Sequence, residues 1–149
     1  MRRPHVPDGS DMTICVAYGP TPEGAAALAL AVREARLRGA SLVALATDRQ
    51  ERFEHDHATD DQALREEIER QLADLRVAGD PEMEVRVVDD GGDAAEAIID
   101  LAVGADAELL VLGLKRRSPV GKLLTGSIAQ RIILDSPMPV LVTHAARSS

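Results

Sequence analysis

Apolar positions along the chain fall into two alternating kinds of segment. Short runs of β-branched and aliphatic residues are typical of buried strands, whereas longer segments with an apolar stripe at helical spacing are typical of amphipathic helices. The expected strands cover residues 12–18, 41–47, 83–88, 108–112 and 140–143, and the expected helices cover 24–38, 61–77, 94–102 and 127–134. Strict alternation of the two predicts parallel strands with right-handed crossovers and helices on both faces of one sheet.

Local signals mark the ends of several helices. Thr21 is a suitable cap for the first helix, and Pro22 stands at its first position, where the missing N–H costs nothing. Gly39 is expected to stop that helix, and Asp93 is expected to cap the third.

The polar segment 48–60 contains His55 and His57 beside Asp56 and Asp60. A His-x-His pair can bind a metal ion, but no third ligand stands at a defined spacing, so an exposed loop is the favoured interpretation. No metal site is expected.

Composition limits the classes of function. The chain has 149 residues, which suits one domain, expected at 12–145 between a loose leader at 1–11 and a tail at 146–149. Aromatic residues are only 1%, so the core must be aliphatic and stacking platforms for single-stranded nucleic acid are lacking. A net charge of -8 argues against nucleic acid and anionic membranes as partners. With no signal peptide or membrane-spanning segment evident, a cytoplasmic location is expected. The single cysteine, Cys15, is expected to be a buried structural thiol.

Ligands of doubly wound sheets bind where strands end, here after Tyr18, Ala46 and Leu112. The last of these ends leads into a basic loop, and Gly126-Ser127 then opens a helix. The first N–H groups of a helix lack internal partners and attract anions, and glycine allows a phosphate to approach the backbone. The segment therefore has the chemistry of a phosphate site. The simpler alternative is that Ser127 only caps its helix and the glycines only make turns.

Charge supports the anion interpretation, since residues 113–135 hold five basic residues against Asp135 alone. A solvated charge cluster is the alternative.

Two named motifs are excluded. Arg116 and Leu123 break the P-loop pattern around Gly121-Lys122, and the dinucleotide fingerprint Gly-x-Gly-x-x-Gly is missing.

With Gly113-x2-Arg116-x9-Gly126-Ser127, the chain resembles the universal stress proteins, whose loop pattern is Gly-x2-Gly-x9-Gly-Ser/Thr. The resemblance covers nearly the whole domain. Further matching segments are 14–18, 92–98, 105–113 and 136–142. The resemblance implies a flavodoxin-like, doubly wound, five-stranded parallel sheet. It also implies a homodimer formed through the last strand, at Val140, Leu141 and Val142.

Some universal stress proteins bind ATP or another adenine nucleotide, and others do not. The resemblance places phosphate contacts at Gly113, Gly126 and Ser127. Further phosphate contacts are expected from Arg116, Gly121 and Lys122 of the basic loop and from the N–H of Ile128. It places adenosine contacts at Tyr18, Gly19, Leu45 and Ala46. Two positions depart from the pattern. Arg116 replaces the second loop glycine, although a guanidinium can itself hold phosphate, and Gly19 stands where the family has an aspartate.

The leading hypothesis is a small dimeric stress-response protein that binds ATP or AMP, with Mg²⁺ left open as a companion ion. The rival is a nucleotide-independent dimer that acts through protein contacts. A slow ATPase ranks last, because no catalytic nucleophile or general base is evident, and the protein is therefore not expected to be an enzyme.

Overall fold

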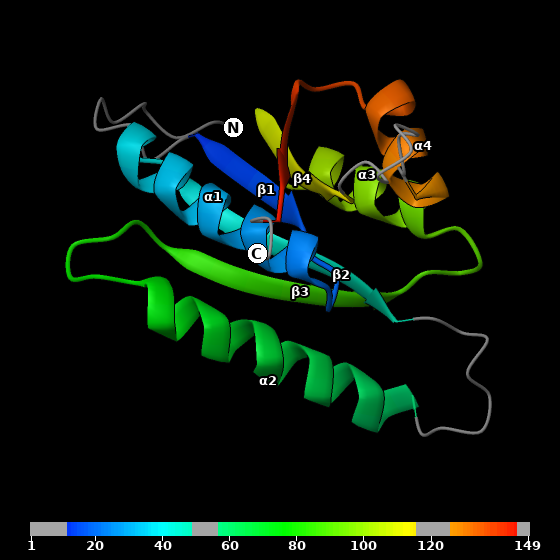
Figure 1. Cartoon of the computed structure of the whole chain (residues 1–149), viewed down its shortest axis with the longest axis horizontal. Helices are drawn as coiled ribbons and strands as arrows, with labels where there is room; N and C mark the ends of the chain where they lie inside the picture. The colour runs from blue at the N-terminus through cyan, green and yellow to red at the C-terminus, as the bar shows by residue number, and fades with distance from the viewer. Residues whose placement is uncertain (1–11, 49–56, 116–125, 146–149) are drawn as a thin grey trace, which may run out of the picture.

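The computed structural model describes residues 12–48, 57–115 and 126–145, and strand alternates with helix throughout them (Figure 1). The strands are β1 (Thr13–Ala17), β2 (Ser41–Asp48), β3 (Met83–Asp89), β4 (Leu109–Leu114) and β5 (Val140–His144). The helices are α1 (Pro22–Arg38), α2 (His57–Leu75), α3 (Ala94–Gly104) and α4 (Ser127–Asp135). Each lies close to its expected range.

The five strands form one parallel sheet in the order β3-β2-β1-β4-β5. The central strand β1 has two partners, and Ile14 pairs with Leu42 on one side and with Leu109 on the other. The direction of winding reverses between β1 and β4, which creates a crevice at the carboxyl ends of these strands. The expected doubly wound, flavodoxin-like α/β fold is therefore confirmed.

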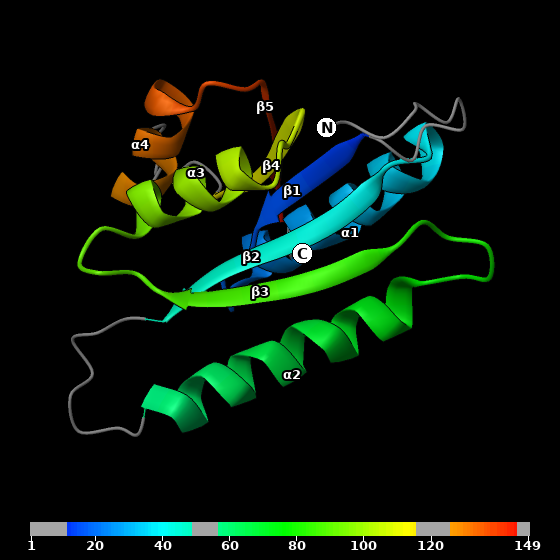
Figure 2. The same cartoon turned by 180° about the vertical axis from the view of Figure 1, so that it is seen from behind.

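Helices cover both faces of the sheet. In Figures 1 and 2, α3 and α4 lie together across the sheet from α2. Alternate residues of a strand point to opposite faces, so β1 supplies both cores: Ile14 and Val16 pack in the cluster with α1 and α2, and Cys15 packs in the cluster with α3 and α4. The central strands are therefore buried on both faces, as their continuous apolar runs require, whereas β3 exposes Glu84 and Arg86 on one face.

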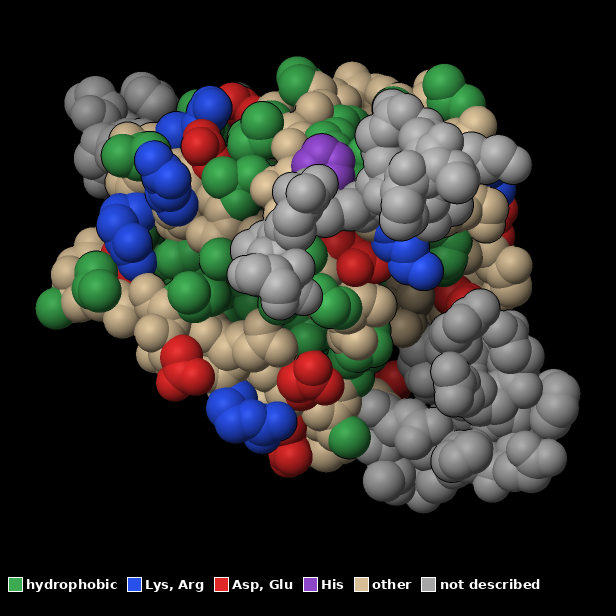
Figure 3. Space-filling view, in the orientation of Figure 1, with side chains coloured by type: hydrophobic (Ala, Val, Ile, Leu, Met, Phe, Trp, Pro, Cys, Tyr) green, Lys and Arg blue, Asp and Glu red, His purple; other side chains and the backbone are tan. Residues whose placement is uncertain are grey.

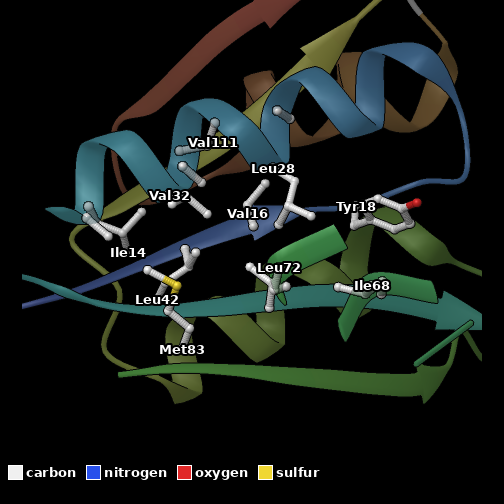
Figure 4. Close-up of a cluster of buried hydrophobic side chains, with 14 of the residues drawn as sticks. Ile14, Val16, Tyr18, Leu28, Val32, Leu42, Ile68, Leu72, Met83 and Val111 are labelled. Carbon is white, nitrogen blue, oxygen red and sulfur yellow. The ribbon is translucent and has the colours of Figure 1, made fainter. Parts of the chain in front are cut away.

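The core beneath α1 and α2 is aliphatic apart from Tyr18, as expected from the composition (Figure 4). The predicted stripe of α2 faces it: Ile68 and Leu72 are 0% and 1% exposed, and Leu64 and Leu75 are partly buried. Cys15 is fully buried, which confirms its structural placement. Burial of these side chains supplies most of the stabilisation of such a domain.

The expected helix caps are present. The Thr21 hydroxyl oxygen accepts a 3.1 Å hydrogen bond from the backbone N–H of Gly24, and Asp93 accepts one of 3.1 Å from that of Glu96. Gly39 ends α1 with φ at 64°, in the left-handed region that favours glycine.

One element differs from expectation. Helix α2 begins at His57, so the loop predicted for 48–60 is wrong over 57–60. These residues lack an apolar stripe and gave no periodic signal, but acidic residues such as Asp60 favour the first turns of a helix. The leader 1–11, His55 and the tail 146–149 lie outside the described residues.

The outer edge of β3 is covered by Arg65 of α2 and by Arg76, the residue that follows this helix. Arg65 donates to the carbonyl oxygen of Val85 and Arg76 to that of Met83, both at 2.8 Å. At the opposite edge, no strand in the described ranges pairs with the outer side of β5, whose residues Val140–Thr143 are only half-buried.

Basic and acidic side chains are interspersed on the face seen in Figure 3, with apolar side chains between them. None of the described helices is long and apolar enough to cross a membrane.

Candidate functional site

A cavity of about 340 Å³ opens at the carboxyl ends of β1, β2 and β4, beside the N-termini of α1, α3 and α4. This volume suits a small organic ligand. Its lining is mostly apolar, with a few polar groups from the strand ends and helix starts. The described lining residues are Ala17, Tyr18, Gly19, Pro20, Thr21, Glu23, Gly24, Thr47, Leu64, Ala94, Ile98, Leu112, Gly113, Leu114, Lys115, Gly126, Ile128, Ala129 and Ile132.

Two glycines hold the first turn of α1 against the strand ends. A Cβ on Gly113 would overlap the backbone carbonyl of Glu23, and a Cβ on Gly24 would overlap the backbone of Gly19. Gly113 was predicted as a phosphate contact. It does line the cavity, but the space beside its α-carbon is filled by α1, so close packing explains why a glycine stands there.

The N-terminus of α4 borders the cavity without a side-chain cap. Gly126 is the capping residue and offers no side chain, while Ser127 is already the first helical residue. The alternative that Ser127 caps the helix is therefore wrong. Gly126 and Ile128 both line the cavity, and a Cβ on Gly126 would meet no atom within 4 Å. Because the first backbone N–H groups of a helix have no internal acceptor, this end can receive an anion.

Ser127 lies on a second, adjoining hollow together with Arg131 and Asp93. The two hollows share Ala94 and Ile128. Arg131 contacts Asp93 at 3.1 Å and Asp135 at 3.3 Å, so this member of the basic group already has carboxylate partners. The N–H of Glu96 and, after it, the Arg131 guanidinium lower the pKa of Asp93.

Glu23 and Lys115 supply the only charged side chains in the described lining of the main cavity. No hydrogen bond or ion pair from another described residue engages either of these side chains. Arg116, Gly121 and Lys122, the remaining predicted phosphate contacts, lie outside the described residues.

The residues predicted to hold adenosine divide into two groups. Tyr18 and Gly19 line the cavity, whereas Leu45 and Ala46 are 0% and 1% exposed in the core and are absent from its described lining. Thr47, the next residue of β2, reaches the cavity in their place. Its position at the strand end was the available signal.

Helices contribute lining residues that sequence reasoning assigned elsewhere or did not single out. Leu64 was assigned to the core stripe of α2, and Ile98 to the body of the third helix. Periodicity cannot tell a core residue from one that lines a cavity between a helix and a strand end.

Tyr18 connects the cavity to α2. Its hydroxyl donates a 2.7 Å hydrogen bond to Glu67 and accepts one of 2.8 Å from Gln71. Burial, followed by the hydrogen bond to Glu67, raises the pKa of the Tyr18 phenol above its ordinary value of 10.0. No cluster of metal-binding side chains occurs among the residues that the structure describes.

A profile of the Universal stress protein family matches residues 12–144. The chain belongs to the universal stress protein family. A universal stress protein of Mycolicibacterium smegmatis is 37% identical over 129 residues, covering 86% of this chain and 94% of that protein.

Solved structures of universal stress proteins have the same fold. One from Archaeoglobus fulgidus superimposes with a TM-score of 0.73 at 28% identity, covering 88% of this chain and 97% of that one. A universal stress protein of the same organism in complex with dAMP has a TM-score of 0.67 at 23% identity, covering 88% of this chain and 96% of that one. A further universal stress protein in complex with cAMP has a TM-score of 0.68 at 21% identity, covering 91% of this chain and 98% of that one. At identities below 25% these two likenesses establish the fold.

Proposed function

We propose that this universal stress protein binds an adenine nucleotide, ATP or AMP, in the main cavity and acts as a dimeric stress-response module of the cytoplasm. The observation that carries the proposal is that an apolar cavity lies beside the uncapped N-terminus of α4, at the carboxyl ends of β1 and β4 where the winding of the sheet reverses. A nucleotide has the matching combination of a flat, weakly polar base and an anionic tail.

The phosphates would meet the backbone N–H groups of Ser127 and Ile128, and Lys115 would offset their charge. The base would lie against apolar lining such as Leu64 and Ile98. Two relatives with this fold were solved with dAMP and with cAMP, which supports an adenine nucleotide as the ligand class. With ATP, Mg²⁺ would accompany the phosphates.

Titration calorimetry of the purified protein with ATP and with AMP tests the proposal. Gly126→Glu places a carboxylate beside the α4 N-terminus, where no atom lies within 4 Å of the new Cβ, so the fold should persist while binding falls at least about tenfold. Gly126→Ala is the matched control, because it adds a methyl group without charge and should bind more tightly than Gly126→Glu. Absence of heat with both nucleotides would contradict the proposal.

The proposed dimer pairs Val140, Leu141 and Val142 of β5 with the same strand of a second copy. Half-buried apolar side chains and an outer side without a described partner strand support it. Light scattering should give twice the mass of the 15.9 kDa chain. A monomeric mass at micromolar concentration would rule this part out.

A nucleotide-independent role through protein contacts is the second candidate. It is favoured by exposed apolar residues on α4, where Leu134 is 72% and Ile133 40% exposed. Adenine absorbance released on denaturing the purified protein would count against it. Neither candidate includes a catalytic step. Phosphate release from ATP that is abolished in Ser127→Ala would contradict both.

A further inference from the structure

Glu23 occupies a fixed position at the rim of the cavity. It stands in the first turn of α1, where the backbone of Glu23 packs against Gly113 and the backbone of Gly19 packs against Gly24. Such close contact with two strand ends leaves the turn little freedom to shift. The α- and β-carbons of Glu23 are therefore held in place before any ligand arrives, which reduces the entropy lost on binding.

The Glu23 carboxylate also differs chemically from the rest of the cavity lining. It is the only carboxylate in the described lining, and no partner among the described residues engages it. An ionised carboxylate only accepts hydrogen bonds, and those that it accepts are about twice as strong as neutral ones. In a largely apolar cavity, such a group selects ligands that present hydrogen-bond donors to it.

Its place in the cavity indicates which donors it meets. Glu23 packs against Gly113, two residues before Lys115 on the strand that leads toward the proposed phosphate site. In a nucleotide the group next to the phosphate is the sugar. Among the described side chains next to it, Gly19 offers no acceptor, and the Thr21 hydroxyl oxygen already uses one lone pair for the N–H of Gly24.

We propose that Glu23 determines the sugar specificity of the site, with its carboxylate accepting hydrogen bonds from the 2′- and 3′-hydroxyls of a ribonucleotide. The inference rests on the proposed nucleotide binding. It makes the protein selective for ribose over 2′-deoxyribose through a residue of α1.

A purely structural role for Glu23 has to be separated from this one, since an acidic residue in the first turn also stabilises its helix through the dipole. Glu96 offers the control. It stands in the first turn of α3 and does not contribute to the described lining of the cavity. Glu23→Gln and Glu96→Gln therefore make the same change to the two helix N-termini, and only the first touches the site.

The test is calorimetric titration of the wild type and both variants with AMP, dAMP and IMP. We expect the wild type to bind AMP about tenfold more tightly than dAMP, as one hydrogen bond to a charged group implies. Glu23→Gln should reduce that ratio below about threefold, and Glu96→Gln should leave it unchanged.

Each other outcome overturns the inference in a distinct way. Equal affinity of the wild type for AMP and dAMP refutes sugar selectivity while leaving nucleotide binding intact. An AMP-to-IMP ratio that changes in Glu23→Gln, with an unchanged AMP-to-dAMP ratio, shows that the carboxylate faces the base. If Glu96→Gln lowers the AMP-to-dAMP ratio as much as Glu23→Gln does, the loss comes from the removed charge at a helix N-terminus and not from contact with the sugar. No binding of any nucleotide removes the proposed function and this inference together.

Discussion

The hydroxyl of Tyr18 lies 2.7 Å from a carboxylate oxygen of Glu67, to which it donates a hydrogen bond. The two residues are 49 positions apart in the sequence, and their contact ties the carboxyl end of β1 to the middle of α2. Because Tyr18 also lines the cavity, the same residue serves the core, the helix and the candidate site.

Tyr18→Phe should lower the free energy of unfolding by about 1–2 kcal/mol, because Glu67 and Gln71 lose a partly buried hydrogen-bond partner while the ring is kept. Urea denaturation followed by far-ultraviolet circular dichroism measures this. Glu34→Gln breaks only a surface pair with Arg38 and should cost less than about 0.5 kcal/mol. Equal stabilities of wild type and Tyr18→Phe would show that the contact contributes nothing.

Gly113→Ala should destabilise the protein by about 1–3 kcal/mol or more, since the added methyl group overlaps the carbonyl of Glu23 and forces α1 away from the strand ends. Gly126→Ala is the comparison, because its methyl group enters open space. Thermal unfolding of the two variants side by side tests the difference. Similar midpoints would mean that the close packing of α1 on β4 is not a constraint.

Acid should weaken the connection between α1 and the turn after α2. The Arg36 guanidinium, with the N–H of Val77, lowers the pKa of Asp80 from 3.8 to about 2. Since the folded-state pKa is the lower one, the stabilisation is complete above the unfolded value of 3.8 and is lost as the pH falls toward about 2.

Unfolding midpoints of the wild type and Asp80→Asn at about pH 5 and about pH 2.5 check this expectation. The variant should be less stable at the higher pH, and the gap should narrow at the lower one. A gap that stays constant with pH would exclude the titration of Asp80 as its cause.

Cys15 should resist thiol reagents in the native protein. Burial raises the pKa of its thiol to about 12, against an ordinary 9.0, so the reactive thiolate is scarce at neutral pH. Labelling in buffer should be at least about a thousandfold slower than in concentrated urea, because the reagent must wait for opening of the sheet. Rapid labelling in buffer would show that β1 opens locally.

The elements of the fold could be predicted largely because both faces of the central strands are covered. Strands such as 41–47 are then continuously apolar, and caps such as Thr21 and Asp93 mark where helices begin. The order of the strands is not contained in that pattern, since nothing in residues 13–17 indicates that β1 pairs with both β2 and β4. Resemblance to a family supplied the doubly wound fold, and the structure supplies the order β3-β2-β1-β4-β5.

The candidate site was predicted in outline, and its details depend on packing. Gly126 and Ile128 line the cavity as expected. Leu45 and Ala46 stay in the core and Thr47 reaches the cavity. The residue at which a strand leaves the core depends on how the helices pack over its end, which the sequence pattern does not show. Gly113 and Glu23 could not be connected from the sequence, since 90 positions separate them and their contact exists only once β4 lies under α1.

The two edges of the sheet also have a consequence for the size of any assembly. Arg65 and Arg76 occupy outward-facing carbonyl oxygens of β3, so an incoming strand would have to displace both guanidinium groups before it could pair there. A subunit whose sheet can pair with another subunit at one edge only cannot form a continuous sheet of many subunits. If copies pair through β5 as proposed, strand addition would end at two copies, because Arg65 of α2 and Arg76 just after it cover the edge at which a third copy would pair.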